Sequence, residues 1–336
     1  MKSIRKVLDH SDCLAGRPRA ERGLQSEWHA PSFLTMSERG KIAVTGASGL
    51  VGRELVETLR RHGYQPLRLV RREPSSADEV RWDPSGGSID LGGLAGITGA
   101  VHLAGDNVAS GRWNEAKKAS IRDSRVQGTA LLAGALAKLS PTPKVMVSAS
   151  AIGYYGARGA EPVDETGALG EGFLASVCAE WEAATDAASR AGIRVVHARI
   201  GVVLAADGGA LAKMKLPFLM GLGGRIGDGR QYMSWIALAD VVSALVFALE
   251  REDLEGPVNL VAPTPVTNAD FTATLGRVLK RPTVLPVPKF ALRLGAGAEM
   301  ANEMLIGGSR VIPAALRAHG FDWEYPTLEP ALRSLF

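Results

Sequence analysis

Three glycines near the start of the chain have the spacing of a turn that holds a phosphate group. Gly46, Gly49 and Gly52 form a G-x-x-G-x-x-G pattern between the apolar run Ile42–Thr45 and a helical stretch with an apolar stripe. The same spacing recurs at three other places, so only this context makes it informative. Glycines here allow a tight turn, a close approach to a pyrophosphate and close packing of helix on sheet. Backbone amides at the helix start then face the phosphates. The predicted cofactor-binding residues of this turn are Gly46, Ser48, Gly49, Leu50, Val51 and Gly52.

The end of the next apolar run indicates which dinucleotide is bound. NAD sites use an acid near the end of the second strand, which accepts hydrogen bonds from the ribose hydroxyls. No acid occurs from Arg60 to Arg72, and the run Leu67–Val70 leads directly into Arg71 and Arg72. Guanidinium groups bind phosphates through paired, charge-assisted hydrogen bonds. The sequence therefore predicts NADP, with both arginines at the 2′-phosphate, although a solvated surface pair is the alternative.

Apolar strands alternate with helical patterns from Lys41 onward, which favours right-handed crossovers and a parallel sheet covered on both faces. The predicted strands are Ile42–Thr45, Leu67–Val70, Ala100–Leu103, Val145–Ser148, Val195–Arg199 and Val258–Val261. The predicted helices are Leu50–His62, Trp113–Leu139, Gly172–Ala191 and Leu238–Leu249. We therefore expect an α/β fold, a Rossmann-type doubly wound parallel sheet with a small, mostly helical C-terminal substrate subdomain.

Changes in composition divide the chain into three parts. Residues 1–39 mix acids and bases without a regular period, and are interpreted as a mobile N-terminal extension, with Met36 as a candidate start. Residues 40–262 form the predicted NAD(P)-binding Rossmann domain. Prolines become frequent after Pro263, so residues 263–336 are predicted to form the C-terminal subdomain.

Charge and cysteine content exclude several classes of protein. The net charge of +4 comes without a continuous basic stripe, so nucleic acid is not an expected partner. No apolar run approaches the ~18 residues that span a bilayer, so no membrane partner is expected.

Cys13 and Cys178 are the two cysteines, which suits a reducing cytoplasm and excludes a disulfide framework. The six histidines have no metal-ligand spacing, and His102 and His197 are interpreted as core residues; no metal is predicted.

A series of motifs extends from about Lys41 to the C-terminus. In order they are Val44–Gly52, His102–Gly105, Gly111–Trp113, Ser124-Arg125, Ser150–Gly156, Arg199 with Gly201–Leu204, Gly223-Gly224, Trp235-Ile236, Val311–Pro313 and Gly320-Phe321. With these motifs the chain resembles the extended short-chain dehydrogenase/reductase superfamily. Within it, the chain is similar to an epimerase-like subgroup of NADP-dependent oxidoreductases that share a short C-terminal domain.

The resemblance implies further cofactor contacts. Leu103 and Ala104 would pass beside the cofactor at the end of a central strand, and Arg125 would reach a phosphate or ribose from the following helix. Residues 201–235 would form a loop insertion over the substrate cleft. The two long helices after the third and fourth strands often pair across dimers in relatives, so a homodimer is compatible with the resemblance.

Relatives in the superfamily transfer hydride with a Ser or Thr, a Tyr and a Lys. Ser150 follows the apolar run Val145–Ser148 and precedes a Tyr-Gly element, so it is the expected serine, with Ser148 as second choice and a structural turn cap as alternative.

The Tyr-x-x-x-Lys pair is the point of departure, since Phe173 and Val177 occupy its expected positions. Tyr154 and Tyr155 are the nearby phenols that could replace it. An untuned phenol is a poor base near neutral pH, yet it can donate a proton in the reductive direction. The alternative is that both tyrosines pack over the nicotinamide without chemistry.

Three functions follow from these residues. The leading hypothesis is an NADP-dependent oxidoreductase acting on a small carbonyl or hydroxyl compound. The second is a sugar-nucleotide epimerase or dehydratase, which the absent acid and the missing Tyr/Lys pair disfavour. The third is an NADPH-binding sensor with little or no turnover. Fold alone does not identify the substrate.

Overall fold

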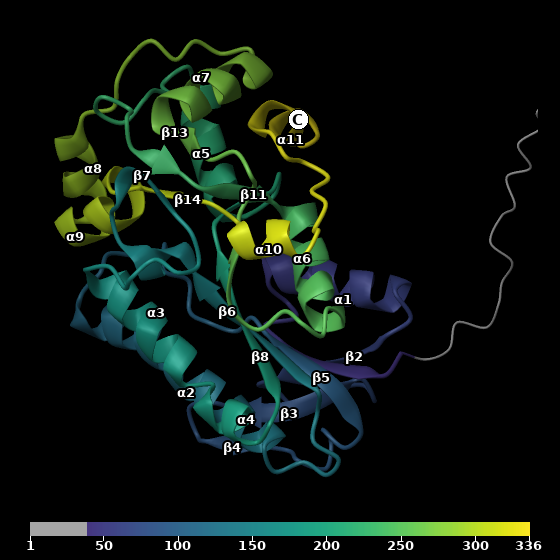
Figure 1. Cartoon of the computed structure of the whole chain (residues 1–336). Coiled ribbons are helices and arrows are strands. Elements are labelled where there is room, and N and C mark those ends of the chain that lie inside the picture. The colour runs from purple at the N-terminus through teal and green to yellow at the C-terminus, as the bar shows by residue number, and fades with distance from the viewer. Residues whose placement is uncertain (1–38) are drawn as a thin grey trace, which may run out of the picture. The chain divides into compact units, whose positions relative to one another are not determined.

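The computed structural model describes residues 39–336, so nearly all of the predicted extension lies outside the described part of the chain. The main sheet in this part has the strand order β12-β8-β6-β5-β1-β2-β3-β4, and every neighbouring pair except β3 and β4 is parallel (Figure 1). The strands are β1 (Lys41–Thr45), β2 (Gln65–Val70), β3 (Glu79–Asp83), β4 (Ser88–Ile89), β5 (Ile97–His102), β6 (Val145–Ala151), β8 (Arg194–Ile200) and β12 (Gly256–Leu260). The predicted doubly wound parallel sheet is confirmed.

The strand order reverses at β1. From this central strand the chain moves outward to β2 and β3, then returns to the other side of β1 and continues through β5, β6, β8 and β12. Crossover connections therefore diverge above the carboxyl ends of β1 and β5. In open α/β sheets this reversal creates the crevice in which ligands bind.

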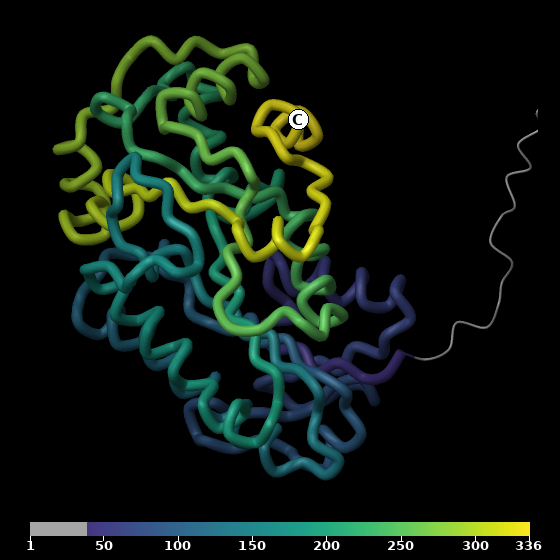
Figure 2. The backbone as a smooth tube through the Cα atoms, viewed as in Figure 1, coloured from purple at the N-terminus to yellow at the C-terminus, as the bar shows by residue number. Residues whose placement is uncertain are grey.

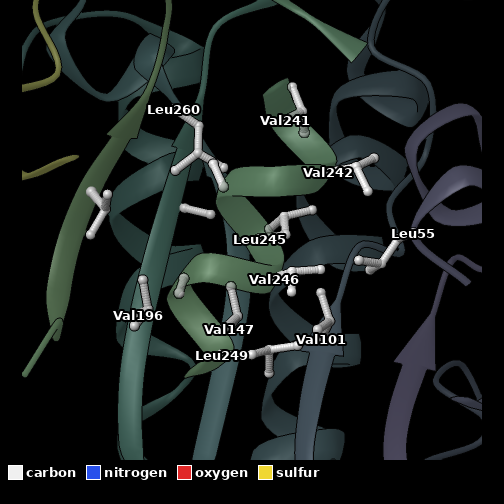
Figure 3. Packing of buried hydrophobic residues seen from close by; sticks show 14 of the residues in the cluster. Leu55, Val101, Val147, Val196, Val241, Val242, Leu245, Val246, Leu249 and Leu260 are labelled. Atoms are coloured by element: carbon white, nitrogen blue, oxygen red, sulfur yellow. The ribbon is translucent and has the colours of Figure 1, made fainter. Parts of the chain in front are cut away.

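Helices cover both faces of the sheet, which explains why the central strands are apolar along their length. One face packs against α1 (Leu50–Arg61) and α6 (Leu238–Glu250), and the other against α2 (Glu115–Leu136) and α4 (Asp186–Arg190). Figure 3 shows how side chains of α6 point onto the strands. Its labelled residues are Leu55, Val101, Val147, Val196, Val241, Val242, Leu245, Val246, Leu249 and Leu260.

Local signals set two helix boundaries that differ from the sequence prediction. Helix α2 begins after Asn114, whose side chain accepts a hydrogen bond from the Lys117 amide at 2.8 Å, as an N-cap does. The predicted helix over residues 172–191 is two helices, α3 (Phe173–Ala183) and α4. At the break, the Thr185 hydroxyl donates to the Glu182 carbonyl at 2.7 Å, a local bond that competes with helix continuation.

The C-terminal part of the chain shares a core with the loops that precede it. Helices α5 (Gly209–Leu219), α7 (Asn268–Leu279) and α11 (Leu328–Arg333) pack around Trp235, which is fully buried. The remaining short elements are β7 (Gly159–Val163), β9 (Val202–Leu204), β10 (Tyr232–Met233), β11 (Trp235–Ala237), β13 (Val266–Thr267), α8 (Lys289–Ala296), α9 (Ala298–Ala301), a π-helical turn (Asn302–Ile306), β14 (Ser309–Val311) and α10 (Ala314–Ala318).

The segment from β14 to α10 passes beside β12 of the main sheet before the chain turns back to α11 at the C-terminus (Figure 2). Strand β14 pairs in parallel with β7, and Phe321 joins the core beside α6. The buried Asp240 carboxylate at the start of α6 accepts hydrogen bonds from the amides of Glu324 (2.8 Å) and Tyr325 (3.1 Å). These contacts attach the helical C-terminal region to the sheet.

Thr45 fixes the ends of the two central strands to each other. Its hydroxyl oxygen accepts hydrogen bonds from the amides of Leu103 (3.0 Å) and Ala104 (3.2 Å) and lies 2.8 Å from Nδ1 of His102. Because both acceptor positions of the oxygen are used, its hydrogen points to Nδ1, and neutral His102 carries its proton on Nε2. Burial lowers the pKa of His102 to about 3, with a smaller contribution from the charge of Arg125.

This lowered pKa makes stability depend on pH. Below pH 6.5 the unfolded chain takes up a proton at His102 and the folded chain does not, so the free energy of unfolding falls as the pH drops from 6.5 toward 3. Between about pH 8 and pH 5, this residue should lower the free energy of unfolding by about 2 kcal/mol. Urea denaturation of wild type and His102→Gln at both pH values measures the free energy of unfolding. Between pH 8 and pH 5 this free energy should fall less in His102→Gln than in wild type. His62→Gln removes a surface histidine as the control, and a His102→Gln profile as steep as wild type contradicts the assignment.

Candidate cofactor-binding and catalytic site

The predicted glycine turn joins β1 to α1 with very close backbone packing. Gly46 has a φ of +67°, and a Cβ atom there would lie 2.8 Å from the carbonyl carbon of Leu103. A Cβ atom on Gly52 would lie 2.1 Å from the carbonyl oxygen of Gly46. Both contacts are shorter than any side chain tolerates, so the turn requires glycine at these two positions.

The first turn of α1 leaves its amides available to a ligand. The helix begins after Gly49, which has no side chain to cap it, and its first turn has no acidic residue. The amides of Leu50, Val51 and Gly52 are therefore among those that have no partner within the helix. Ser48 and Gly49 are exposed beside them. The turn thus has the open backbone and the positive end of a helix that a pyrophosphate group requires.

The two predicted phosphate-binding arginines differ in their surroundings. Arg72 makes a paired salt bridge with Glu79, with Nη1 to Oε2 at 2.8 Å and Nη2 to Oε1 at 2.6 Å. Arg71 is exposed and makes no ion pair with any residue between 39 and 336. Both arginines follow β2, but only Arg71 has no carboxylate partner between residues 39 and 336.

The end of β5 lies against the glycine turn. Leu103 and Ala104, predicted to pass beside the cofactor, are held there by Thr45, and the backbone of Leu103 touches Gly46. The loop after them therefore starts directly at the crevice where the strand order reverses.

Arg125 reaches the loop after β5 from α2. Its Nη1 donates to the carbonyl oxygens of Asp106 and Ile121, both at 3.0 Å, and its Cζ lies 5.0 Å from the ring centre of Trp181. A Cβ atom on Gly105 would lie 3.2 Å from this guanidinium carbon. Burial lowers the pKa of Arg125, and no carboxylate in the described part of the chain forms a salt bridge with it. It is a partly buried cation beside the loop that follows β5.

Ser150 lies near the end of β6 and belongs to a buried charged network. Its hydroxyl donates to Oε1 of Glu182 at 2.7 Å. The same carboxylate forms a paired salt bridge with Arg199 of β8, with both nitrogen–oxygen distances at 2.8 Å. The side chain of Arg199 is 4% exposed and that of Glu182 is 11% exposed. Because an isolated buried charge is costly, each member of this pair requires the other.

The two neighbouring tyrosines of the 3₁₀ turn Ile152–Tyr155 have different environments. Tyr155 is fully buried; its hydroxyl donates to Oδ1 of Asn259 at 2.7 Å and accepts from Nη1 of Arg199 at 2.9 Å. Burial raises the pKa of Tyr155 to about 12. Tyr154 is partly exposed, and its ring centre lies 3.5 Å from the guanidinium carbon of Arg199. Its hydroxyl has no hydrogen-bond partner among the described residues, and Tyr154 is the more exposed of the two tyrosines.

Apolar side chains fill the positions where relatives carry Tyr and Lys. Phe173 begins α3, and its ring packs against Trp113, with ring centres 5.1 Å apart, and against Lys118, whose Nζ lies 5.1 Å from the ring centre. Val177, one turn later, is 2% exposed. The Glu303 carboxylate accepts hydrogen bonds from the first two amides of α3, both at 2.8 Å. The C-terminal region thereby caps the helix on which the missing pair would stand.

Glu182 and Thr45 are site residues that sequence reasoning did not identify. A signal for Glu182 was present, since Arg199 closes an apolar strand and a buried guanidinium needs a carboxylate partner. Nothing in the sequence indicated which of the acids would provide it. His102 is fully buried, as expected for a core histidine, whereas the side chain of His197 is 19% exposed and lies 2.9 Å from the Thr185 hydroxyl.

Other features lie away from this crevice. A cavity of about 570 Å³ is lined by Arg39, Tyr64, Lys144 and Glu250, at the opposite, amino-terminal edge of the sheet. Among residues 39–336, no three His, Cys, Asp or Glu side chains are grouped so that they could hold a metal ion. No helix in the same range is long and apolar enough to cross a bilayer.

Comparisons with known proteins agree with this architecture. The chain is 45% identical to an epimerase family protein of Mycobacterium leprae, over 88% of this chain and 95% of the relative. The crystal structure of the human epimerase family protein SDR39U1 with NADPH has a TM-score of 0.80 and 33% identity, covering 88% of this chain and 98% of that one. A nucleoside-diphosphate sugar epimerase of Corynebacterium glutamicum has a TM-score of 0.72 and 36% identity, covering 88% of this chain and 58% of that one.

Two family matches divide the chain. Residues 287–335 match a domain of unknown function, DUF1731. Residues 42–261, which include the sheet and the crevice, match the second family. The predicted relationship to epimerase-like extended dehydrogenases is thereby confirmed: the chain belongs to the NAD dependent epimerase/dehydratase family.

Proposed function

We propose that this chain binds NADPH and NADP⁺ at the crevice between β1 and β5 and acts as an oxidoreductase on a small carbonyl or hydroxyl compound. The observation that carries the proposal is the glycine turn, whose close packing and uncapped amides fit a dinucleotide pyrophosphate. The 2′-phosphate is assigned to Arg71, with Arg72 beside it. The structure of human SDR39U1 with NADPH supports the choice of cofactor.

Arg125 suits the phosphate or ribose contact proposed for it. It is a cation without a carboxylate partner in the described chain, and it lies beside the loop that starts at Leu103 and Ala104. An anionic ligand in the crevice would complete its charge balance.

The bound cofactor would supply or accept a hydride, and the chain's own residues would manage the proton. In the reductive direction, hydride adds to the carbonyl carbon and the carbonyl oxygen takes a proton from the hydroxyl of Tyr154. The positive charge of Arg199, which lies against the Tyr154 ring, offsets the negative charge that develops as the proton leaves. Solvent then returns the proton to Tyr154, which is partly exposed.

Ser150 would orient the substrate rather than donate to it. Its hydrogen is already given to Glu182, so its oxygen offers lone pairs toward a substrate hydroxyl. Tyr155 takes a structural role in this proposal, because its hydroxyl is engaged on both sides inside the fold.

A second candidate function is an NADPH-binding sensor with little or no turnover. The observation that favours it is the replacement of the usual Tyr and Lys by Phe173 and Val177, which cannot transfer or tune a proton. Sugar-nucleotide epimerisation, the activity in the name of the Corynebacterium glutamicum relative, is the third. The same replacements disfavour it, because family members with that chemistry use the pair.

The glycine turn is tested with two matched substitutions in helices. Gly52→Ala forces the turn to shift, because its Cβ atom would meet the oxygen of Gly46, whereas a Cβ atom on Gly134 of α2 meets nothing within 4 Å. We expect Gly52→Ala to weaken binding of both NADPH and NADH at least about tenfold in calorimetry, and Gly134→Ala to leave both unchanged. Equal affinities of Gly52→Ala and wild type would exclude this turn as the pyrophosphate site.

Discrimination between cofactors tests Arg71. Arg71→Ala should weaken NADPH binding about tenfold, the effect of losing one charge-assisted contact to a phosphate, and leave NADH binding unchanged. Arg72→Ala should have a smaller effect on NADPH, because Arg72 is bound to Glu79. Arg190→Ala, in an exposed pair on α4, is the control. If the Arg71→Ala protein keeps the wild-type ratio of the two affinities, the assignment of Arg71 fails.

Turnover is tested by NADPH oxidation over a panel of small carbonyl compounds, with Tyr154→Phe and Tyr155→Phe as a matched pair. Tyr154→Phe should lower kcat about a hundredfold or more and leave NADPH affinity unchanged, because it removes the proton donor. Tyr155→Phe should lower the melting temperature, since Asn259 and Arg199 lose a buried partner, yet keep kcat within a few fold. Comparable rates for Tyr154→Phe and wild type exclude Tyr154 as the donor. NADPH binding without oxidation of NADPH by wild type would favour the sensor.

A further inference from the structure

Two segments around the C-terminal lobe contain no acidic residue. Residues 208–227 and 271–298 together hold eight lysines and arginines but no aspartate or glutamate. At the chain's average of 35 acids in 336 residues, 48 residues would contain about five. The absence is therefore a local bias of charge.

The structure brings these segments side by side. The amide of Val287 donates to the Arg225 carbonyl at 2.8 Å, and the amide of Gly227 donates to the Val287 carbonyl at 2.9 Å. Nε of Arg281 donates to the carbonyl of Leu219 at 3.0 Å. In Figure 1 the connection from α7 to α8 forms the arch at the top of the molecule. Loops that are far apart in sequence therefore share one surface.

Both segments carry large apolar side chains that are exposed. Val284 is 83% exposed, Leu285 65%, Phe290 66% and Leu294 69%. On α8, Phe290 and Leu294 are four residues apart and so lie on the same side of the helix. No residue of this helix is buried. We define the acid-free face by its exposed apolar residues Leu216, Leu219, Met220, Leu222, Val284, Leu285, Phe290 and Leu294.

Most cations of the acid-free face form no salt bridge in the described part of the chain, although Lys289 lies near a carboxylate: the pKa of Asp228 is lowered by the Arg230 amide and, to a smaller extent, by the charge of Lys289. Of the eight, Arg277 alone forms a salt bridge with a described residue, namely Glu329. The seven others are Lys213, Lys215, Arg225, Lys280, Arg281, Lys289 and Arg293. Several donate hydrogen bonds to neutral groups, such as Lys213 to the Ala109 carbonyl, which leave the charge uncompensated.

We propose that the acid-free face docks on an anionic lipid bilayer. Exposed Leu, Val, Met and Phe side chains suit the boundary of the hydrocarbon layer, and lysines and arginines around them suit anionic headgroups. The short helix α8, with Lys289 and Arg293 next to Phe290 and Leu294, would lie in the plane of the interface. This partner differs from the sequence prediction of no membrane partner, which rested only on the absence of a segment that could span a bilayer.

Two other occupants fit the face less well. In a symmetric dimer the same patch would meet itself, which would set seven unpaired cations against seven more. Protein interfaces are enriched in Tyr, Trp, Phe, Met and Arg, and the two acid-free segments contain the last three but no Tyr or Trp. A lipid surface requires neither.

Vesicle flotation of the full chain tests the proposal. Wild type should bind vesicles with about 30% phosphatidylglycerol in phosphatidylcholine at least about fivefold more than phosphatidylcholine alone, and salt near ~0.5 M should reduce that binding. Leu285→Ser/Phe290→Ser and Arg225→Glu/Lys289→Glu should each lower binding at least about fivefold. Neither Arg225 nor Lys289 makes an ion pair with a described residue, so the charge reversals leave the recorded salt bridges intact.

Matched controls are Leu91→Ser and Lys138→Glu, which change an exposed leucine and an exposed unpaired lysine outside the face. Both should bind vesicles as wild type does. Equal binding of wild type to neutral and anionic vesicles would overturn the proposal. Light scattering provides a second test. If wild type is a dimer and Leu285→Ser/Phe290→Ser is a monomer, the face is a contact between two copies, and the proposal is overturned.

Discussion

The contact between the glycine turn and the end of β5 is the constraint on which the candidate site depends. Gly46 leaves no space for a side chain against Leu103, and the Thr45 hydroxyl accepts both amides that follow β5. The two strand ends are therefore held at a fixed separation, with the uncapped start of α1 above them. A rigid turn of this kind holds backbone amides at fixed positions, as the binding of a dinucleotide pyrophosphate requires. The buried His102 is part of that support, and its burial lowers its pKa to about 3.

A second constraint is the buried pair of Glu182 and Arg199. It connects α3 with β8, holds the hydroxyl of Ser150 and determines what surrounds both tyrosines. Breaking one member of a buried pair costs about 3–5 kcal/mol, since the other charge remains without compensation. The carboxyl end of β6 and β8 is thus organised by a buried ion pair. This arrangement allows the usual Tyr and Lys to be absent while a phenol and a cation still stand together.

The C-terminal region has two roles in the structure. Part of it completes the fold, because Phe321 enters the core beside α6, Asp240 receives two amides from the last segment, and Glu303 caps α3. The other part presents apolar and basic side chains outward on the acid-free face. A surface of this kind is costly to leave in water, so its persistence in a folded chain calls for a partner.

Sequence alone determined the six principal strands, the glycine turn and the helical C-terminal region, because apolar periodicity and glycine spacing are properties of neighbouring residues. It did not predict β3, the short strands β7, β9, β10, β11, β13 and β14, or helix α5, whose pairing and packing partners are distant in the chain. Nor could it distinguish Tyr154 from Tyr155 or Arg71 from Arg72. In both cases adjacent residues of the same type differ only in which distant partner they meet: Arg199 and Asn259 for Tyr155, and Glu79 for Arg72. Only the tertiary structure separates the environments of these neighbours, because hydrogen bonding and burial depend on contacts that no local pattern encodes.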